Sequence, residues 1–372
     1  MIVSRLLGVQ LAALGLALVI LPGTATPESQ TGKATTRLTA ETLLKHAAMT
    51  GPQLEALQQG KVVTLGFSRL ELMPEQLAAT LLVVVPAKVP EVAAKIADRI
   101  SLPQHEGAPA AYDLERETDN IFAKAVVFGS NDAAEINHLL SARPGDAYNF
   151  STEEIEWFQT AAADLSQGRS QYAGPAEAMT ATFRRVLRAR YQAYRTRGLR
   201  GVVPYDRGYA VYVDPAEGLR IALDSIDLLR GYFPRFYLAF RNYPTANADG
   251  YRQRHVLIKT MARGRPVFAL AHWMVDINES YALIAERQYY VSHTYDALQN
   301  TIACLPYRGG TLVGLLNQTF TGKVAGFARA IRHNIGRNRI EEKIRPLFES
   351  LRDAFGAHRS ATRDRAGRRL QG

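Results

Sequence analysis

Toward the C-terminus, apolar and polar residues follow a pattern that predicts consecutive β-strands. Two glycine-containing turns, Arg263-Gly264 and Arg308-Gly309-Gly310, separate segments rich in β-branched and aromatic residues. The five predicted strands are Arg252 to Ala262, Pro266 to Asp276, Tyr281 to Val291, Asp296 to Leu305 and Thr311 to Phe320. Because short loops join them, we expect one antiparallel meander sheet.

After the last of these strands the spacing of apolar residues changes to three and four. This spacing, from Val324 to Phe355, predicts a long amphipathic helix, bent or broken near Gly336. The strands before it are apolar on both faces, so the sheet requires a cover on each side. We expect the helix to lie across the concave face of the sheet, over a mostly apolar cavity, and the helical middle of the chain to contribute the second cover.

The first part of the chain predicts fewer strands. Lys61 to Phe67 and Ala78 to Pro86 are expected strands, and Pro90 begins a helix that continues through Ile100. A further strand is predicted from Ile121 to Phe128.

The middle of the chain is predicted to be helical from Asp132 to Arg197. Ser151 and Glu154 have the spacing of a capping box, and Pro175 marks the start of another helix. From Tyr209 onward strands are expected to dominate.

The first 25 residues have the order of a secretory signal peptide. Arg5 is their only charge, Leu6 to Ile20 is apolar, and small residues follow at Gly23 and Ala25. An uncleaved membrane anchor is the alternative to cleavage after Ala25. We therefore expect an exported protein, periplasmic or extracellular.

These patterns define the expected fold class and domain organisation. The class is α+β, with an antiparallel meander sheet gripped by a long C-terminal amphipathic helix and with a large helical insertion. The parts are a signal peptide at 1–25, a linker at 26–36, the N-terminal part of the α+β domain at 37–130, the helical insertion at 131–200, the sheet and C-terminal helix at 201–356, and a basic tail at 357–372.

This order of elements resembles that of the START-like helix-grip superfamily. The segments Gly60 to Val63 and Ala78 to Asp98 look like its opening strand and helix, and Thr311 to Phe355 looks like its closing strand and helix. A departure is the long, partly helical stretch between them, where the family has a short connection. The resemblance implies a cavity between sheet and helix for a lipid or other hydrophobic molecule, and it does not by itself imply an enzyme.

The charge of the chain bears on its partners. The sequence has 45 Lys and Arg against 35 Asp and Glu, a net charge of +10 at pH 7. The anions available to an exported protein are lipid headgroups and envelope polymers, so we expect an anionic membrane surface rather than nucleic acid. The outer side of the C-terminal helix would supply a basic ridge of Arg329, Arg332, Arg337, Arg339, Arg345 and Arg352.

Motifs for a metal or a nucleotide cofactor are absent from the sequence, so we expect neither. Ser292, His293 and Asp296 are the residue types of a serine hydrolase. Ser292 and His293, however, are neighbours on a strand and point to opposite faces. The single cysteine, Cys304, lies in an apolar stretch and is expected to be a buried, inert thiol.

Two histidines are expected to meet in the sheet. A hairpin centred on Arg263-Gly264 pairs residues whose numbers sum to 527, which places His255 opposite His272. Glu286 would join them from the next strand if the intervening loop is symmetric.

The expected function is that of a carrier or sensor for a hydrophobic or lipid-like ligand. The alternative is an envelope enzyme that acts on a lipid or cell-wall polymer through a polar site near His255, His272 and Glu286. The candidate ligand-binding residues are His255, His272, Glu286, Tyr290, Phe327 and Ile331.

Overall fold

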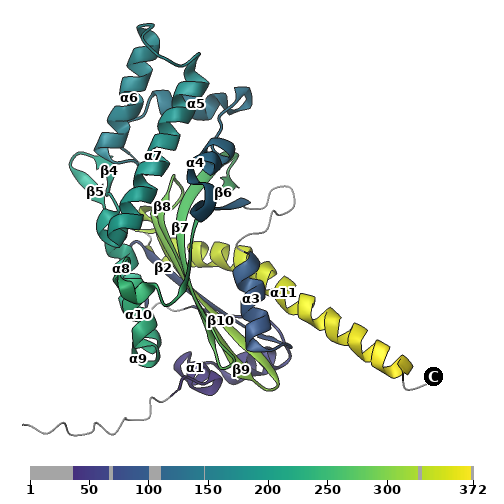
Figure 1. The fold of residues 1–372 in the computed structure, drawn as a ribbon. Coiled ribbons are helices and arrows are strands. Elements are labelled where there is room, and N and C mark those ends of the chain that lie inside the picture. The colour runs from purple at the N-terminus through teal and green to yellow at the C-terminus, as the bar shows by residue number, and fades with distance from the viewer. Residues whose placement is uncertain (1–36, 67–69, 100–109, 146, 326–328, 370–372) are drawn as a thin grey trace, which may run out of the picture. The chain divides into compact units, whose positions relative to one another are not determined.

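A large antiparallel sheet organises the protein (Figure 1). The computed structural model describes residues 37–66, 70–99, 110–145, 147–325 and 329–369. Within these residues, eight strands form one sheet in the order β1-β2-β10-β9-β8-β7-β6-β3. Its strands are β1 (Val63–Gly66), β2 (Gln76–Val85), β3 (Ala110–Asp113), β6 (Arg252–Ala262), β7 (Arg265–Ile277), β8 (Ala282–Val291), β9 (Ala297–Tyr307) and β10 (Gly310–Phe320).

The meander from β6 to β10 confirms the strand prediction. Each of these strands pairs antiparallel with the next, and β10 also pairs with β2 from the N-terminal part of the chain. Arg263 and Gly264 both have positive φ, as do Arg308 and Gly309. Two left-handed residues between paired strands match the twist of a hairpin, which is why these short turns fix the register.

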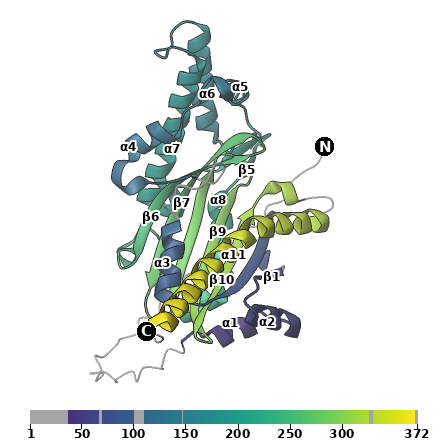
Figure 2. The same cartoon turned by 90° about the vertical axis from the view of Figure 1, so that its right-hand side faces the viewer.

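Helices cover both faces of the sheet, as Figures 1 and 2 show. A second, two-stranded sheet consists of β4 (Tyr205–Gly208) and β5 (Val211–Val213). The α-helices are α1 (Ala40–His46), α2 (Gly51–Gln58), α3 (Val89–Arg99), α4 (Leu114–Ala125), α5 (Ala133–Leu140), α6 (Thr152–Ser166), α7 (Pro175–Arg197), α8 (Pro215–Asp224), α9 (Asp227–Tyr232), α10 (Pro234–Arg241) and α11 (Arg329–Arg369).

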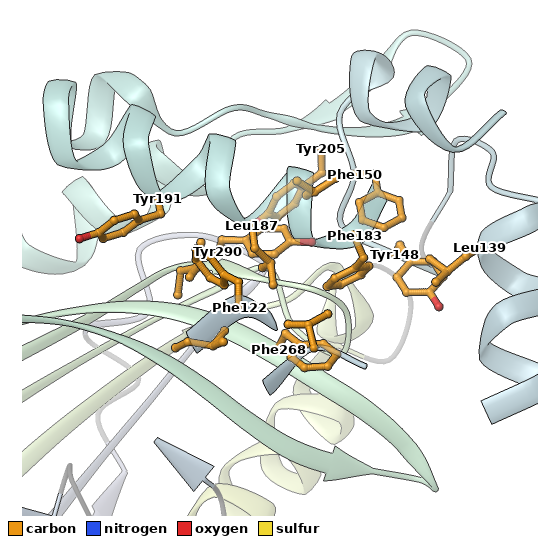
Figure 3. Close-up of a cluster of buried hydrophobic side chains, with 14 of the residues drawn as sticks. Phe122, Leu139, Tyr148, Phe150, Phe183, Leu187, Tyr191, Tyr205, Phe268 and Tyr290 are labelled. Atoms are coloured by element: carbon orange, nitrogen blue, oxygen red, sulfur yellow. The ribbon is translucent and has the colours of Figure 1, made fainter. Parts of the chain in front are cut away.

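One face of the sheet, here called the α7 face, packs against the helical middle of the chain. Phe183 and Leu187 of α7 lie in one buried cluster with Phe268 and Tyr290 of the sheet (Figure 3). The predicted helix starts are confirmed: α6 has a capping box between Ser151 and Glu154, and Pro175 opens α7.

The opposite face, here called the α11 face, packs against α3 and α11. Phe348 and Leu351 of α11 belong to a buried cluster with Val83 and Val313 of the sheet. The predicted two-sided cover is therefore confirmed. The helix continues through Gly336, where a Cβ atom would lie 2.6 Å from Cδ1 of Leu77, so the expected break is absent because this glycine allows close packing.

Two other expectations were wrong. Residues 121–125 belong to helix α4 rather than to a strand: Phe122 and Ala125 are buried at helical spacing, and the Asp113 carboxylate caps the helix by accepting from the backbone N–H of Glu115. Helices continue through α8, α9 and α10, beyond the expected insertion at 131–200, before the meander begins. The basic tail is helical as far as Arg369, since its arginines and alanines favour a helix.

No helix in the described part of the chain combines the length and the apolar character that crossing a membrane requires.

Candidate functional site

A band of polar residues crosses the middle of the apolar meander on both faces of the sheet. Because side chains alternate between faces along a strand, neighbouring residues contribute to opposite sides of the band. On the α7 face the cross-strand partners form what we call the Arg287 row: His255, His272, Arg287, Gln299 and Gln318. On the α11 face they form the Glu286 row: Trp273, Glu286, Asn300 and Asn317.

The predicted histidine pair is confirmed. His255 is the register partner of His272, and their rings stack with centroids 4.7 Å apart and planes 7° from parallel. Burial lowers the pKa of His255 to about 4, and Arg195 acts in the same direction. Burial, then His255 and Arg287, lowers the pKa of His272 well below its usual range, so both rings are neutral at neutral pH.

A directional hydrogen-bond chain joins Arg287 to His272. The Gln253 Oε1 atom lies 3.1 Å from Nε2 of His272 and can only accept, so Nε2 carries the proton. Nδ1 of His272 is then the acceptor for the Tyr194 hydroxyl at 2.9 Å. The same hydroxyl accepts a hydrogen bond from Nη1 of Arg287 at 3.3 Å.

Arg287 is buried without a counter-charge. Its side chain is 0% exposed, and its Cζ atom lies 4.1 Å from the centre of the Phe240 ring. Nη1 also donates to the Phe240 carbonyl oxygen at 3.3 Å. Among the described residues, Nε and Nη2 have no hydrogen-bond partner and no carboxylate forms an ion pair with the guanidinium. A buried charge in this condition is costly unless something compensates it.

The two glutamines of the Arg287 row are also incompletely bonded. Gln299, directly opposite Arg287, is 0% exposed, and neither end of its amide has a partner among the described residues. Gln318 donates to the Ser225 hydroxyl at 3.0 Å, while its Oε1 atom is unpartnered within the same part of the chain. The row thus contains both hydrogen-bond donors and acceptors that have no partner among the described residues.

Glu286 lies on the other face, so the expectation that it would join the histidines was wrong. The paired residue numbers of β7 and β8 sum to 559, so His272 pairs with Arg287, and Glu286 pairs with Trp273. A register change of one residue moves a side chain to the opposite face. This separation also removes the basis for an enzyme site composed of His255, His272 and Glu286.

Three members of the Glu286 row, Glu286, Asn300 and Asn317, are joined by hydrogen bonds, whereas the buried Nε1 atom of Trp273 has no partner among the described residues. The carboxylate accepts from Nε2 of Gln288 at 2.7 Å and from Nδ2 of Asn300 at 2.6 Å. Asn317 donates to Asn300 at 2.8 Å, and the Tyr295 hydroxyl donates to Gln288 at 2.5 Å. Burial raises the pKa of Glu286, although the bonds from Gln288 and Asn300 act in the opposite direction.

An apolar cavity of about 110 Å³ lies near the Arg287 row, on the α7 face. Residues of α1, of β2 and β8 to β10, and of the segment 225–233 line it, and nine of its nineteen lining residues are leucines. Ser225 belongs to the lining and also bonds Gln318, while the lining residue Thr301 has a buried hydroxyl without a partner in the described chain. The cavity therefore lies beside the row.

Of the remaining ligand-binding candidates, Tyr290 is not among the residues that line this cavity. Tyr290 is 0% exposed in the aromatic cluster between α7 and the sheet, with the Cζ atom of Arg190 4.4 Å from its ring centre (Figure 3). Phe327 lies outside the described residues, and the side chain of Ile331 is not described. The cavity lies on the face opposite α11, so its position differs from the one expected.

The basic ridge expected on α11 is only partly present. Arg332 donates to the Ala325 carbonyl at 2.9 Å. Three other arginines of the ridge bind residues 60–71: Arg337 binds Glu71, Arg345 donates to the Val62 carbonyl at 2.8 Å, and Arg352 donates to the Gly60 carbonyl at 2.9 Å. They attach the helix to the region of β1. Arg332 and Arg339 are exposed, and the side chain of Arg329 is not described.

Ser292, His293 and Asp296 do not form a catalytic triad. Ser292 Oγ accepts from the backbone N–H of Phe268, and Nε2 of His293 contacts the Pro266 carbonyl at 3.0 Å. Asp296 accepts from Arg207 at 2.7 Å and lines a separate cavity of about 310 Å³.

Cys304 is buried, as expected, and burial raises its pKa to about 12, so its thiol stays protonated at neutral pH. Within the described residues no three His, Cys, Asp or Glu side chains lie together as a metal site.

The sequence-based prediction did not include Arg287, Gln299 or Gln318. The register of the last hairpin, however, could have shown that Gln299 and Gln318 are paired. The hairpin at Arg308-Gly309 pairs residues whose numbers sum to 617, which places Gln299 opposite Gln318. Arg287 is a charged residue inside an otherwise mostly apolar strand.

Comparisons with known proteins were made for the whole chain. No model of a protein family matches it, and no match is found among curated proteins or among solved structures.

Proposed function

We propose that the protein is a carrier or sensor for a hydrophobic or lipid-like small molecule. The observation that carries this proposal is the leucine-lined cavity on the α7 face. The atoms of its walls have no van der Waals contacts across the empty space. An apolar group that enters the cavity leaves water and gains these contacts. An apolar cavity of about 150 Å³ is enough to bind benzene, so about 110 Å³ suits a short alkyl segment.

The opening of the cavity allows for a longer ligand. His46 and Asp227 belong to its lining and have exposed side chains, so the remainder of a ligand can extend past them toward water. The signal-like residues 1–25 support a role outside the cytoplasm, and the resemblance to START-like proteins supports a hydrophobic ligand.

The test is a titration with neutral 1-alkanols from ethanol to decanol, followed by calorimetry. We expect affinity to rise by about fourfold for each methylene group until the cavity is filled, the increment for burying one methylene. Ala303→Phe, which places a ring in the cavity, should abolish the rise, and Ala134→Phe on the exposed side of α5 is the matched control. Affinity that does not depend on chain length would contradict the proposal.

A further inference from the structure

Other arginines of this protein show what Arg287 lacks. Arg190, Arg241 and Arg265 each present Nε and Nη2 together to the two oxygens of one carboxylate. In the buried pair of Arg190 and Glu154 both distances are 2.6 Å. This edge of the guanidinium matches the geometry of a carboxylate, which is why the pairing recurs.

In Arg287 the same two nitrogens are the unpartnered ones. Nη1 is used by Tyr194 and Phe240, whereas Nε and Nη2 remain without a partner in the described chain. The neighbouring histidines are neutral, so no other charged group belongs to the Arg287 row. The row therefore suits a single negative charge with two acceptor oxygens.

We propose that Arg287 binds the carboxylate of the ligand, so that the ligand is a monocarboxylic acid with an apolar chain. The inference rests on the proposed function for the chain, which would occupy the leucine-lined cavity. The carboxylate would accept hydrogen bonds from Nε and Nη2 of Arg287 and from the Gln299 amide.

The arrangement of β9 connects the two halves of this site. Thr301, which lines the cavity, is two residues from Gln299 and on the same face, a distance of roughly 7 Å along the strand. Gln299 is therefore a neighbour of both parts, since it lies opposite Arg287 on β8 and two residues from Thr301 on β9. Because its amide has no hydrogen bonds to break among the described residues, it can turn aside or turn toward an entering carboxylate.

The test compares octanoate with 1-octanol, which differ in charge and hardly in length. In the unmodified protein octanoate should bind at least about tenfold more tightly, as expected for charge-assisted hydrogen bonds. Arg287→Met should abolish that preference, because it weakens octanoate binding far more than octanol binding. Arg287→Lys, which keeps the charge but not the two-nitrogen edge, should retain only part of it. Arg339→Met on the exposed side of α11 is the matched control.

The outcomes separate this inference from the proposed function. Equal binding of octanoate and octanol, or a preference that survives in Arg287→Met, overturns the carboxylate site while the apolar cavity stands. Binding of acetate that depends on Arg287, without a gain from a longer chain, supports the carboxylate site and overturns the hydrophobic ligand. Octanol binding also reports whether the Arg287 variants are folded.

Discussion

The two faces of the polar band differ in how the buried charged side chain on each is hydrogen-bonded. On the α11 face, the Glu286 carboxylate accepts from two amide groups, and the bonds continue to Asn317 and Tyr295. On the α7 face, Arg287 has two unpartnered nitrogens, and Gln299 opposite it has no partner in the described chain. These residues occupy adjacent positions on the same strands, so strand position does not explain the difference.

The difference indicates two roles. A polar network whose members hydrogen-bond to one another inside a sheet fixes register and packing, and it needs no further molecule. A partly bonded one is costly, and it persists where a ligand completes it. The hydrogen-bonded part of the Glu286 row therefore stabilises the sheet, whereas the Arg287 row is where we propose that a ligand binds.

The largest expected effect comes from comparing Arg287 with the paired arginine on its own face. Arg190→Met leaves Glu154 buried and unpaired, and Glu154 is only 4% exposed, so the free energy of unfolding should fall by about 3–5 kcal/mol. Arg287→Met removes an unpaired charge, so unfolding free energy without ligand should stay the same or rise by up to about 2 kcal/mol.

Urea unfolding of both variants measures this contrast directly. A loss in Arg287→Met as large as that in Arg190→Met would mean that the Arg287 guanidinium is already compensated, and the contrast between the two faces would fail.

The two faces should also respond to pH in opposite directions. The pKa of His255 is lowered from 6.5 to about 4, so its contribution to stability is present above pH 6.5 and is lost as the pH falls toward 4. The loss amounts to about 3 kcal/mol at most. Unfolding measured between pH 7 and 4 should show this loss in the unmodified protein and a smaller one in His255→Phe.

Glu286 has the opposite sign. Its pKa is raised above the ordinary 4.5, so its contribution is present below pH 4.5 and is lost as the pH rises through the raised pKa. Glu286→Gln should lack this dependence. If His255→Phe and Glu286→Gln changed the pH profile in the same direction, the assignment of opposite signs would be wrong.

The smallest expected effect separates two tyrosine hydroxyls. Tyr295→Phe removes the hydrogen bond to Gln288 on the α11 face and should lower the unfolding free energy by about 1 kcal/mol. Tyr289→Phe removes a buried hydroxyl without a partner in the described chain, on the α7 face, and should cost nothing. Equal losses in the two variants would show that the Tyr289 hydroxyl is bonded in solution.

Local sequence signals predicted most of the sheet but not the site. The strands β6 to β10 were predictable because alternation and two hairpin turns agree, and the register placed His255 opposite His272. The strand expected at Ile121 to Phe128 was wrong because a short apolar run suits a buried helix as well as a strand.

The site depends on contacts that no local pattern contains. Glu286 was assigned to the wrong face because the register between β7 and β8 depends on where the loop between them is centred, and the paired numbers sum to 559 rather than to the 558 that would place Glu286 opposite His272. The cavity was expected under the C-terminal helix, but it forms where α1 and the segment 225–233 meet the sheet. Packing between distant segments determines both outcomes.

The position of β2 in the sheet has a consequence for synthesis of the chain. This strand is buried along almost its whole length, and its partner on one side is β10, with Val85 opposite Thr311. The ribosome must therefore add 225 residues after Val85 before Thr311 is made, which takes roughly 10 to 45 s at ordinary rates. During this interval the nascent chain has an unpaired edge rich in leucine and valine, the kind of segment that aggregates or binds chaperones.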